Sequence, residues 1–325
     1  MENFKFAIMG AGGISRQFCD AVSRVEGCEV IAIASRTKEH AEAFAKENGI
    51  KAAYGGYEQM LKEEKPDCVY IAVVVSAHYE LSMLCLDYRV PVLCEKAMFS
   101  CSAHAREVFG RSAELKVFVM EALWSRFLPA FNKAKQWLME GRIGEPAFLD
   151  IGIGFVAPPD KNNRYFNAKL GGGVAMDITV YAYELTTYLI SQKIEEMKVS
   201  AIFGETGVDV TDQIGIRFEN MLATLNTSFV GVMEERLEIF GDKGRIIVPN
   251  PHFSSEAFLY DEKKELREHF KDEVTKNGFV YEIKEVIECI RRGEIESPTV
   301  PHSTTIECAE LFDRIMECRP GSGEE

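Results

Sequence analysis

A glycine-rich turn directly after a short apolar run is the feature that most constrains the fold of this chain. Phe4–Met9 is an apolar run of strand length, and Gly10–Ser15 reads Gly-Ala-Gly-Gly-Ile-Ser. The next segment, Ile14–Arg24, places its apolar residues on one face of a helix. A strand, a glycine turn and a helix in this order are the context that a dinucleotide fingerprint requires. The sequence therefore predicts a pyrophosphate site at Gly10, Ala11, Gly12, Gly13 and Ile14.

The residue types inside the turn fit contact with a phosphate. Gly10 allows a tight turn, and Gly12 allows the backbone to approach a pyrophosphate, whose charge the helix N-terminus favours. The third glycine position of the fingerprint is Ser15, which is small enough for close packing of helix on strand. A structural turn without a ligand is the alternative.

The first 120 or so residues continue as an alternation of strands and helices. The expected elements are Glu29–Ala34, Thr37–Lys46, Tyr57–Glu64, Asp67–Val75, His78–Tyr88 and Pro91–Cys94. The expected strands are continuously apolar, which is typical of a parallel sheet that is covered on both faces. We predict an α/β fold with an N-terminal Rossmann dinucleotide-binding domain over residues 1–122.

The pattern then changes and predicts a second, α+β domain over residues 123–325. Helices are expected at Pro129–Glu140 and Val174–Ile190. Strands are expected at Ala147–Phe155, Val199–Phe203, Gln213–Phe218, Met221–Phe229, Arg236–Phe240 and Arg245–Val248. The turn residues between them favour hairpins and a largely antiparallel open sheet. Two C-terminal helices, Val280–Arg291 and Ser303–Cys318, could pack back on the first domain.

Composition excludes several classes of protein. The chain has 325 residues and a formal net charge of −14, which argues against a nucleic-acid partner because such proteins gather positive charge. The longest apolar run, Cys68–Val75, is far shorter than the roughly 20 residues of a membrane helix. The N-terminus lacks the basic start and apolar stretch of a signal peptide, so a cytoplasmic location is expected. His252, His269 and His302 show no metal-ligand spacing, so no metal is predicted.

The residues that close the second expected strand bear on the choice of cofactor. An acid at this position would accept hydrogen bonds from the ribose of NAD and repel a 2′-phosphate. This chain has Ser35 and Arg36 there, with Lys38 close by. A hydroxyl, a guanidinium and an ammonium suit a phosphate dianion, so the sequence predicts NADP(H). A solvated turn at Arg36 is the alternative.

Three polar residues occupy positions that suggest proton transfer. Lys96 ends an expected parallel strand at its carboxyl edge, where ligands of such sheets bind. Asp177 and Tyr181 are spaced i, i+4 on an otherwise apolar helix that follows Gly171–Gly173, so they share one face. Burying an acid and a phenol is costly unless they have a use. A surface lysine, a structural aspartate and a core tyrosine are the alternatives.

The order of these motifs resembles that of the glucose–fructose oxidoreductase/inositol dehydrogenase (Gfo/Idh/MocA) family of pyridine-nucleotide oxidoreductases. Within this family the chain is most similar to the dimeric dihydrodiol dehydrogenase branch. The resemblance covers almost the whole chain, and its motifs are specific through their order and spacing. They are Gly10–Ser15, His78–Glu80, Val92–Lys96, Met120–Phe127, Gly171–Tyr183 and Glu296–Pro298.

The resemblance implies a set of residues around the nicotinamide. The lysine of the family's Glu-Lys-Pro motif maps onto Lys96, with Glu95 before it, and contacts the nicotinamide region and the substrate. Ala97 stands in place of the family's proline. Val73–Val75 stand in place of its Thr-Pro-Asn, which removes polar groups near the cofactor-binding residue Val73. His78 is expected near the cofactor at a helix start, with a plain structural role as the alternative.

The resemblance also implies roles in catalysis. In the dihydrodiol branch the matching aspartate and tyrosine lie in the active site, and the tyrosine is proposed as the proton-transfer residue. We therefore assign Tyr181 as general acid/base, with Lys96 stabilising its phenolate and Asp177 orienting the substrate.

Other residues are expected to line the substrate pocket. In that branch the segment that contains Trp124 and Arg126 lines the pocket, and interdomain packing is the alternative. Phe155 and Arg164 precede Gly171 and are expected to form a lid over the substrate.

The expected function is an NADP-dependent oxidoreductase that acts on a small-molecule sugar, polyol or cyclic dihydrodiol. A non-catalytic NADP(H)-sensing regulator is the alternative that the changes at Val73–Val75 and Ala97 favour. A lyase or hydrolase that holds NAD tightly is a third, which Ser35 and Arg36 oppose. Relatives associate through the open face of the second sheet, so a homodimer is expected, with Leu222, Leu225 and Phe229 on that face.

Overall fold

The computed structural model describes residues 3–321 and divides into two compact units. Unit 1 comprises Met1–Trp124 and Lys276–Ala309, and unit 2 comprises Ser125–Thr275 and Glu310–Glu325. The C-terminal helix α9 (His302–Glu317) therefore gives its first part to unit 1 and the rest to unit 2. None of the helices in the described residues is long and apolar enough to cross a membrane.

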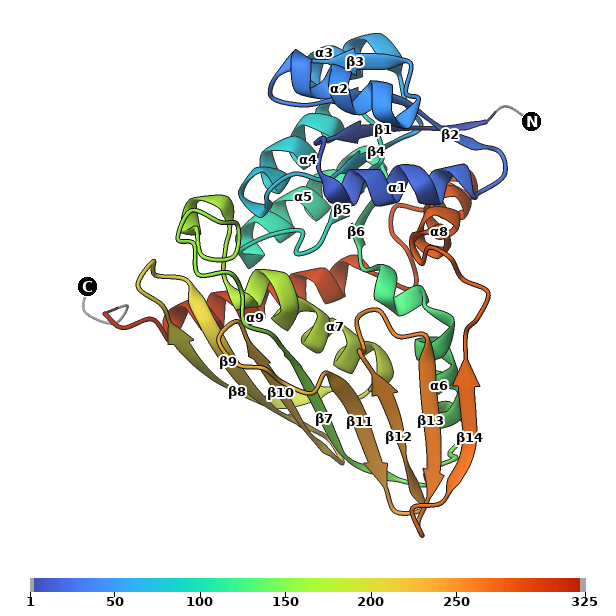
Figure 1. Ribbon diagram of the computed structural model, residues 1–325, viewed down its shortest axis with the longest axis vertical. Coiled ribbons are helices and arrows are strands. Elements are labelled where there is room, and N and C mark those ends of the chain that lie inside the picture. The colour runs from blue at the N-terminus through green and yellow to red at the C-terminus, as the bar shows by residue number, and fades with distance from the viewer. Residues whose placement is uncertain (1–2, 322–325) are drawn as a thin grey trace. The chain divides into compact units, whose positions relative to one another are not determined.

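A parallel sheet forms the centre of unit 1, in the strand order β3-β2-β1-β4-β5-β6 (Figure 1). All five strand pairs are parallel, which confirms the predicted Rossmann-type domain. Every residue of β4, β5 and β6 is buried, as expected for strands that are covered on both faces. The strands are β1 (Phe4–Met9), β2 (Cys28–Ala34), β3 (Ala52–Tyr54), β4 (Cys68–Ile71), β5 (Val92–Glu95) and β6 (Val119–Ala122).

Helices alternate with the strands of unit 1, and α1 to α4 lie where the sequence predicted them, whereas α5 was not predicted. Thr37 caps the second helix, because its hydroxyl accepts the His40 N–H at 3.4 Å. Phe18 of α1 packs on the sheet, with its ring stacked 3.8 Å from Tyr70 of β4. The helices are α1 (Gly13–Ser23), α2 (Lys38–Asn48), α3 (Tyr57–Glu64), α4 (His78–Asp87), α5 (Ser102–Leu115) and α8 (Phe279–Arg292).

The predicted strand Asp67–Val75 is wrong at its C-terminal end. Strand β4 stops at Ile71, and a 3-10 turn at Val75–Ala77 precedes α4. Val74 is 38% exposed, so the apolar run leaves the sheet before it ends. Hydrophobicity alone could not place this boundary, because the exposed and the buried valines have the same side chain.

Unit 2 is built on a second sheet, in the order β14-β13-β12-β11-β7-β10-β9-β8. Its pairs are antiparallel except β7 with β10, which confirms the largely antiparallel α+β prediction. The strands are β7 (Pro146–Gly154), β8 (Ile194–Phe203), β9 (Asp209–Phe218), β10 (Leu222–Ser228), β11 (Arg236–Gly241), β12 (Gly244–Pro249), β13 (Glu256–Asp261) and β14 (Leu266–Lys271).

One face of this sheet is covered by helices, as Figure 1 shows. Helix α6 (Pro129–Met139) packs on β12, β13 and β14, and helix α7 (Val180–Leu189) packs on β7 and β10. The other face is more polar. On it the Thr224 hydroxyl donates to Asp150 at 2.7 Å, and Arg217 pairs with Glu195.

The predicted open face of β10 is wrong in two of its three residues. Leu225 and Phe229 are fully buried on the core side, whereas Leu222 is 50% exposed. Side chains alternate along a strand, so Leu222 and Leu225, three residues apart, must point to opposite faces. Leu222 alone of the three can lie on an open face.

The predicted helix Val174–Ile190 begins with an unusual turn. Ala175–Thr179 form a π-turn, and the Val180 N–H donates to the Ala175 carbonyl five residues earlier. Helix α7 then runs over Val180–Leu189. Such π-turns are rare and are found frequently at functional sites.

Candidate functional site

The turn after β1 is shaped so that only glycine fits its first position. Gly10 has φ +109°, and a Cβ there would come within 2.2 Å of the Ala72 carbonyl oxygen. The Ser15 hydroxyl donates to the Gly10 carbonyl at 2.6 Å and holds the turn against α1. This contact gives Ser15 a use beyond its small size.

The next two glycines face open space. A Cβ on Gly12 or Gly13 would meet no atom within 4 Å, and Gly12 caps α1 without any side-chain hydrogen bond. The first N–H groups of a helix have no partner inside the helix and favour an anion. The turn therefore fits a dinucleotide phosphate in shape and in polarity.

The residues that follow β2 divide into one buried anchor and two exposed cations. Ser35 is 4% exposed, and its hydroxyl donates to the Thr37 carbonyl at 2.8 Å. Arg36 and Lys38 are exposed, and the Lys38 ammonium lies 3.8 Å from the Glu42 carboxylate. Both cations are thus available at the end of β2.

His78 ties together the segments that follow β4 and β5. It is 1% exposed, with Nδ1 3.1 Å from the Ala97 carbonyl and Nε2 3.2 Å from the Val73 carbonyl. Burial lowers the pKa of His78, and a neutral imidazole donates from one nitrogen only. His78 therefore positions the backbone on either side of it.

Glu95 and Lys96 end β5 in different environments. The Glu95 side chain is buried, accepts a hydrogen bond from the Tyr70 hydroxyl and accepts the Lys96 N–H at 3.3 Å. Burial raises the pKa of Glu95, while Tyr70 and Lys96 oppose the rise. Lys96 is half-buried, and the Lys96–Ala97 peptide bond is cis.

In unit 2 an ion pair holds Asp177. Arg164 donates to Asp177 Oδ1 at 2.9 Å, and its guanidinium lies 4.1 Å from the Tyr165 ring centroid. Phe155 packs 5.7 Å from Tyr165 and 5.4 Å from Phe229, measured between ring centroids. Phe155 and Arg164, predicted together as a lid, thus both contact Tyr165.

Tyr181 lies next to a residue that the sequence did not assign to this site. Tyr181 is 7% exposed, and its ring lies 5.2 Å from the His252 ring. The Ser125 hydroxyl fixes the backbone there by donating to the His252 carbonyl at 2.6 Å. The spacing of the histidines argues against His252 as a metal ligand, and the sequence assigns it no other role. Its Pro-Asn-Pro-His-Phe context after a strand is a loop signal that could have pointed to it.

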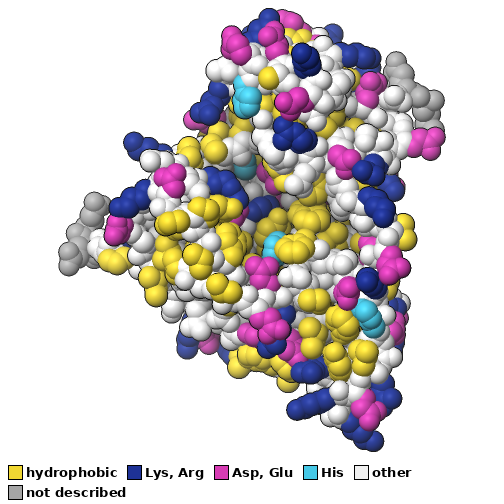
Figure 2. Space-filling model, in the orientation of Figure 1, with side chains coloured by type: hydrophobic (Ala, Val, Ile, Leu, Met, Phe, Trp, Pro, Cys, Tyr) yellow, Lys and Arg dark blue, Asp and Glu magenta, His cyan; other side chains and the backbone are white. Residues whose placement is uncertain are grey.

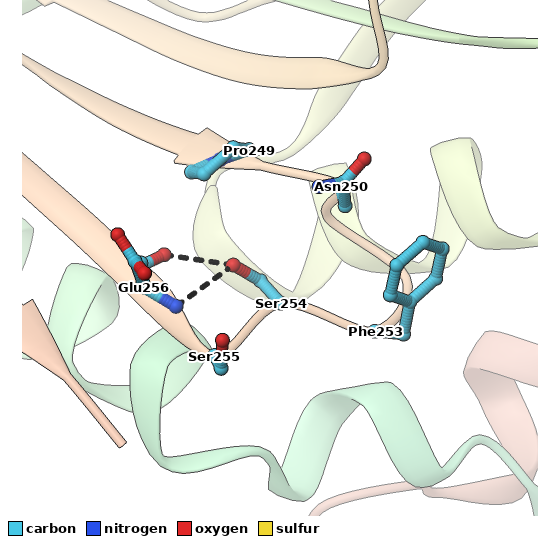
Figure 3. Close-up of a pocket in the computed structure, with 6 residues that line it drawn as sticks. All are labelled: Pro249, Asn250, Phe253, Ser254, Ser255 and Glu256. Carbon is cyan, nitrogen blue, oxygen red and sulfur yellow. Dashed lines mark hydrogen bonds between the residues drawn. The ribbon is translucent and has the colours of Figure 1, made fainter. Parts of the chain in front are cut away.

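The loop around His252 also borders a pocket, shown in Figure 3. In this loop the Ser254 hydroxyl donates to the Glu256 carbonyl at 2.7 Å and accepts the Glu256 N–H at 3.2 Å. Phe253, 49% exposed, packs edge-on against His252. The pocket is lined by Pro249, Asn250, Phe253, Ser254, Ser255 and Glu256.

Trp124 and Arg126 are placed differently from each other. Arg126 is 1% exposed, forms an ion pair with the Glu184 carboxylate and donates to the Glu184 carbonyl at 2.9 Å. Both residues belong to unit 2, so this pair holds the Arg126 guanidinium inside its own unit. Trp124 belongs to unit 1, where it packs edge-on against Phe279 at 5.1 Å.

The predicted site residues are divided between the two units. In unit 1 the glycine turn, Ser35, Val73, His78 and Lys96 all follow carboxyl ends of neighbouring parallel strands, where such sheets bind ligands. In unit 2, Asp177 lies in the π-turn, and Tyr181 lies on α7, which follows it. No group of three or more His, Cys, Asp and Glu within residues 3–321 is arranged to hold a metal ion.

The visible face of the molecule carries charges of both signs (Figure 2). On the face that Figure 2 shows, Lys and Arg side chains are interspersed with Asp and Glu. This distribution differs from the clustered positive charge of a nucleic-acid-binding surface.

Comparison with known proteins relates both units to one family. The oxidoreductase family with an NAD-binding Rossmann fold, GFO/IDH/MocA, matches residues 4–123, and the C-terminal domain of that family matches residues 131–247. The human trans-1,2-dihydrobenzene-1,2-diol dehydrogenase is 30% identical over 96% of this chain and 96% of its own length.

Two solved structures share the fold at lower identity. A 3-ketoreductase from Actinomadura kijaniata, in complex with NADP, is 21% identical with a TM-score of 0.85, covering 97% of each chain. A levoglucosan dehydrogenase in complex with NADH is 16% identical with a TM-score of 0.87, covering 98% of this chain and 97% of its own. The neighbours thus include both nicotinamide cofactors.

These matches span both units, and the identity to curated dehydrogenases extends over nearly the full length. The enzyme class is therefore that of a dehydrogenase or reductase acting on CH–OH groups, with an NAD(P)-binding Rossmann domain. The chain belongs to the GFO/IDH/MocA family of oxidoreductases.

Proposed function

We propose that this enzyme uses NADP(H) and transfers hydride between the nicotinamide and a secondary alcohol or carbonyl of a sugar, polyol or cyclic dihydrodiol. One observation carries the proposal. The open glycine turn after β1 and Lys96 after β5 follow strands of the same parallel sheet, at the same carboxyl edge. The diol class follows the name of the curated relatives, and the sugar and polyol classes follow the family resemblance.

The preference for NADP(H) rests on the end of β2. No acid closes this strand, and Arg36 and Lys38 are both exposed beside it. Two cations and the backbone anchored by Ser35 can neutralise and hydrogen-bond a 2′-phosphate, which an acid would repel.

The cofactor would be held by the turn at Gly12 and Gly13 and would supply or accept the hydride. In the oxidation direction, the alcohol C–H bond breaks with its electron pair, and Tyr181 oxygen takes the hydroxyl proton. In the reduction direction, the same oxygen returns the proton to the carbonyl oxygen. On the family resemblance we assign Lys96 the stabilisation of the Tyr181 phenolate. Asp177, held by Arg164 at 2.9 Å, would accept a hydrogen bond from a substrate hydroxyl.

A binding experiment tests the cofactor assignment. Arg36→Asp should weaken NADPH binding by about tenfold to a hundredfold and NADH binding much less, because the new acid repels the 2′-phosphate. Quenching of protein fluorescence by each cofactor gives the two dissociation constants. Lys51→Asp, an equal charge change at another exposed residue of unit 1, is the control and should leave both constants unchanged. Equal losses for NADPH and NADH in Arg36→Asp would remove the assignment.

A nucleotide-sensing regulator on the same fold is the second candidate. The observation that favours it is the apolar Val73–Val75 segment, which leaves Val74 38% exposed after β4. The two candidates differ in turnover. A sensor would bind NADPH and convert none of a panel of aldoses, inositols, cyclic diols and their ketones.

A further inference from the structure

We propose that Asp209 and Asp212 form a proton-sharing carboxyl pair that positions the π-turn from which Asp177 and Tyr181 act. Both are positioning residues, because neither is assigned contact with substrate or cofactor. The catalytic meaning of the pair rests on the proposed function. Its role in holding the π-turn does not depend on that function, and hydrogen exchange separates the two roles.

Asp209 fixes the start of the π-turn. It lies at the first residue of β9, where the register against β8 shifts between Ile202 and Phe203, so the usual alternation of faces does not hold between Asp209 and Asp212. Asp209 is 3% exposed, and its Oδ2 accepts the Ala175 N–H at 2.6 Å. The other oxygen, Oδ1, lies against the glycine run. A Cβ on Gly173 (φ +127°) would lie 2.3 Å from Asp209 Oδ1. The carboxylate thus serves as an N-terminal cap that comes from a different element.

Asp212 fixes the other end of the same turn. It is 1% exposed, and its Oδ2 accepts the Thr179 hydroxyl at 2.8 Å. The Thr179 hydroxyl also lies 2.6 Å from the Thr227 hydroxyl of β10. Ala175 and Thr179 are the first and last residues of the π-turn, so two carboxyls from one strand hold both of its ends.

This arrangement places the pair around the catalytic segment. Asp177 is the middle residue of the π-turn, and Tyr181 is the second residue of α7, which follows at once. A turn with i→i+5 bonding lacks the usual helical pattern, so bonds from outside are needed to keep its register. The pair supplies them at both ends.

Two ionised carboxylates at these positions would repel each other, so the pair also needs a proton. Neither takes part in an ion pair in the described chain, and Asp212 Oδ1 has no hydrogen-bond partner there. Burial and the neighbouring Asp209 charge raise the pKa of Asp212 to about 8, and burial raises the pKa of Asp209. One proton shared between them removes the charge repulsion and provides the missing donor.

Within residues 3–321, no basic group contributes to the pKa shift of either carboxyl. The π-turn presents the Ala175 N–H and the Thr179 hydroxyl, and β10 presents the Thr227 hydroxyl. On β8, the cross-strand neighbours of Asp209 and Asp212 are Phe203 and Ala201. The acid of the turn itself, Asp177, is paired with Arg164. Each carboxyl is therefore the titrating group that acts on the other.

The sign of the pH dependence follows from the raised pKa. An opened turn lets Asp212 ionise near its ordinary value of 3.8, whereas the closed turn keeps a proton until about pH 8. Between these values the closed form binds a proton that the open form lacks, so closure weakens as pH rises and levels off above about pH 8.

Hydrogen exchange of the protein without ligands measures this opening. After correction for intrinsic exchange, protection of the amides of 175–180 should fall by up to about tenfold per pH unit between about pH 5 and 7.5, then level off. Asp212→Asn cannot ionise at this position, so its protection should depend on pH less steeply than that of the wild type. Asp150→Asn, which removes a carboxyl on the opposite face of the same sheet, is the control and should keep the wild-type profile.

Two results would overturn the pair: a flat profile in the wild type, or an unchanged slope in Asp212→Asn. If Asp212→Asn does not fold, Thr179→Val gives the second test, because it removes the hydroxyl that Asp212 accepts. Thr179→Val should lower protection at every pH and lower kcat by about tenfold, with NADPH affinity within about twofold. A wild-type kcat and wild-type protection in that variant would refute the positioning role.

The catalytic assignment can fail without affecting this result. If no substrate is turned over, the exchange profiles still confirm or refute the pair. If the profiles are as expected and Tyr181→Phe retains full activity, the pair holds the turn and the proposed proton transfer is wrong.

Discussion

At the scale of single residues, the cofactor site depends on one glycine for its shape and on two for its openness. Gly10 has no room for a side chain beside the Ala72 carbonyl, whereas Gly12 and Gly13 have room that nothing in the described chain fills. The same residue type therefore serves two purposes within four positions. Substitution by alanine should separate stability from binding.

Gly10→Ala should destabilise the protein by about 2 kcal/mol or more, because the methyl group meets the Ala72 oxygen and φ +109° strains any other residue. Gly12→Ala meets no atom within 4 Å and should leave the melting temperature close to wild type while weakening NADPH binding. Thermal unfolding and cofactor titration of both variants provide the check. The account fails here if Gly12→Ala is the less stable variant.

Residue types predicted some roles and hid others. The glycine turn, Thr37 as a cap and Lys96 at a strand end were all visible, because their chemistry follows from local sequence. His252 was missed because its neighbour Tyr181 is 71 positions away in the chain. In the structure the Arg126 guanidinium forms an ion pair with Glu184, a partner that no local sequence pattern indicates.

At the scale of elements, buried acids mark the places where helices meet sheets. Glu282 of α8 is fully buried, and neither of its oxygens has a hydrogen-bond partner in residues 3–321. Burial and the Glu95 charge raise its pKa well above the ordinary value, so folding favours its protonated form. Because the unfolded chain ionises Glu282 at lower pH, this residue makes the fold less stable as pH rises.

Glu282→Met should therefore raise the free energy of unfolding by about 2 kcal/mol near pH 8 and by less near pH 5. Thermal unfolding at the two pH values measures the difference. Glu288→Met on the same helix replaces a largely exposed carboxylate and serves as the control. An equal gain for Glu282→Met at both pH values would show that the buried acid does not titrate as described.

The elements themselves were only partly predictable. Strands with buried alternation, such as β10 and β12, were expected close to their observed bounds, whereas β9 begins at Asp209, four residues before the expected Gln213. Strands β13 and β14 were missed, since β14 reads Leu-Arg-Glu-His-Phe-Lys and has no fully buried residue to create a pattern. The π-turn was also invisible, because its bonds to Asp209 and Asp212 come from a distant strand.

At the scale of the whole molecule, association with a second copy is the open question. We propose a homodimer through the face of the second sheet that no helix covers, on the strength of the family resemblance. Leu222 is the residue of the expected face that is exposed, at 50%, and it lies beside polar residues of β9 and β10.

Light scattering should give twice the chain mass of 36.5 kDa at micromolar concentration. Leu222→Arg should shift the mass toward one chain, because a buried apolar contact would gain an unpaired charge. Val274→Arg, at an 84% exposed position outside this face, is the control and should remain dimeric. A wild-type mass of one chain would refute the dimer.

Hydride transfer from NADPH, with Tyr181 as the proton-transfer residue, is the proposal on which the other assignments depend. The most direct measurement follows deuterium from deuterated NADPH into the alcohol formed from a panel of cyclic ketones and dicarbonyls, read by mass spectrometry. We expect label on the carbinol carbon with wild type, a rate at least about a hundredfold lower with Tyr181→Phe, and a rate near wild type with Tyr183→Phe. NADPH binding without transfer of label to any member of the panel, or equal rates for wild type and Tyr181→Phe, would contradict it.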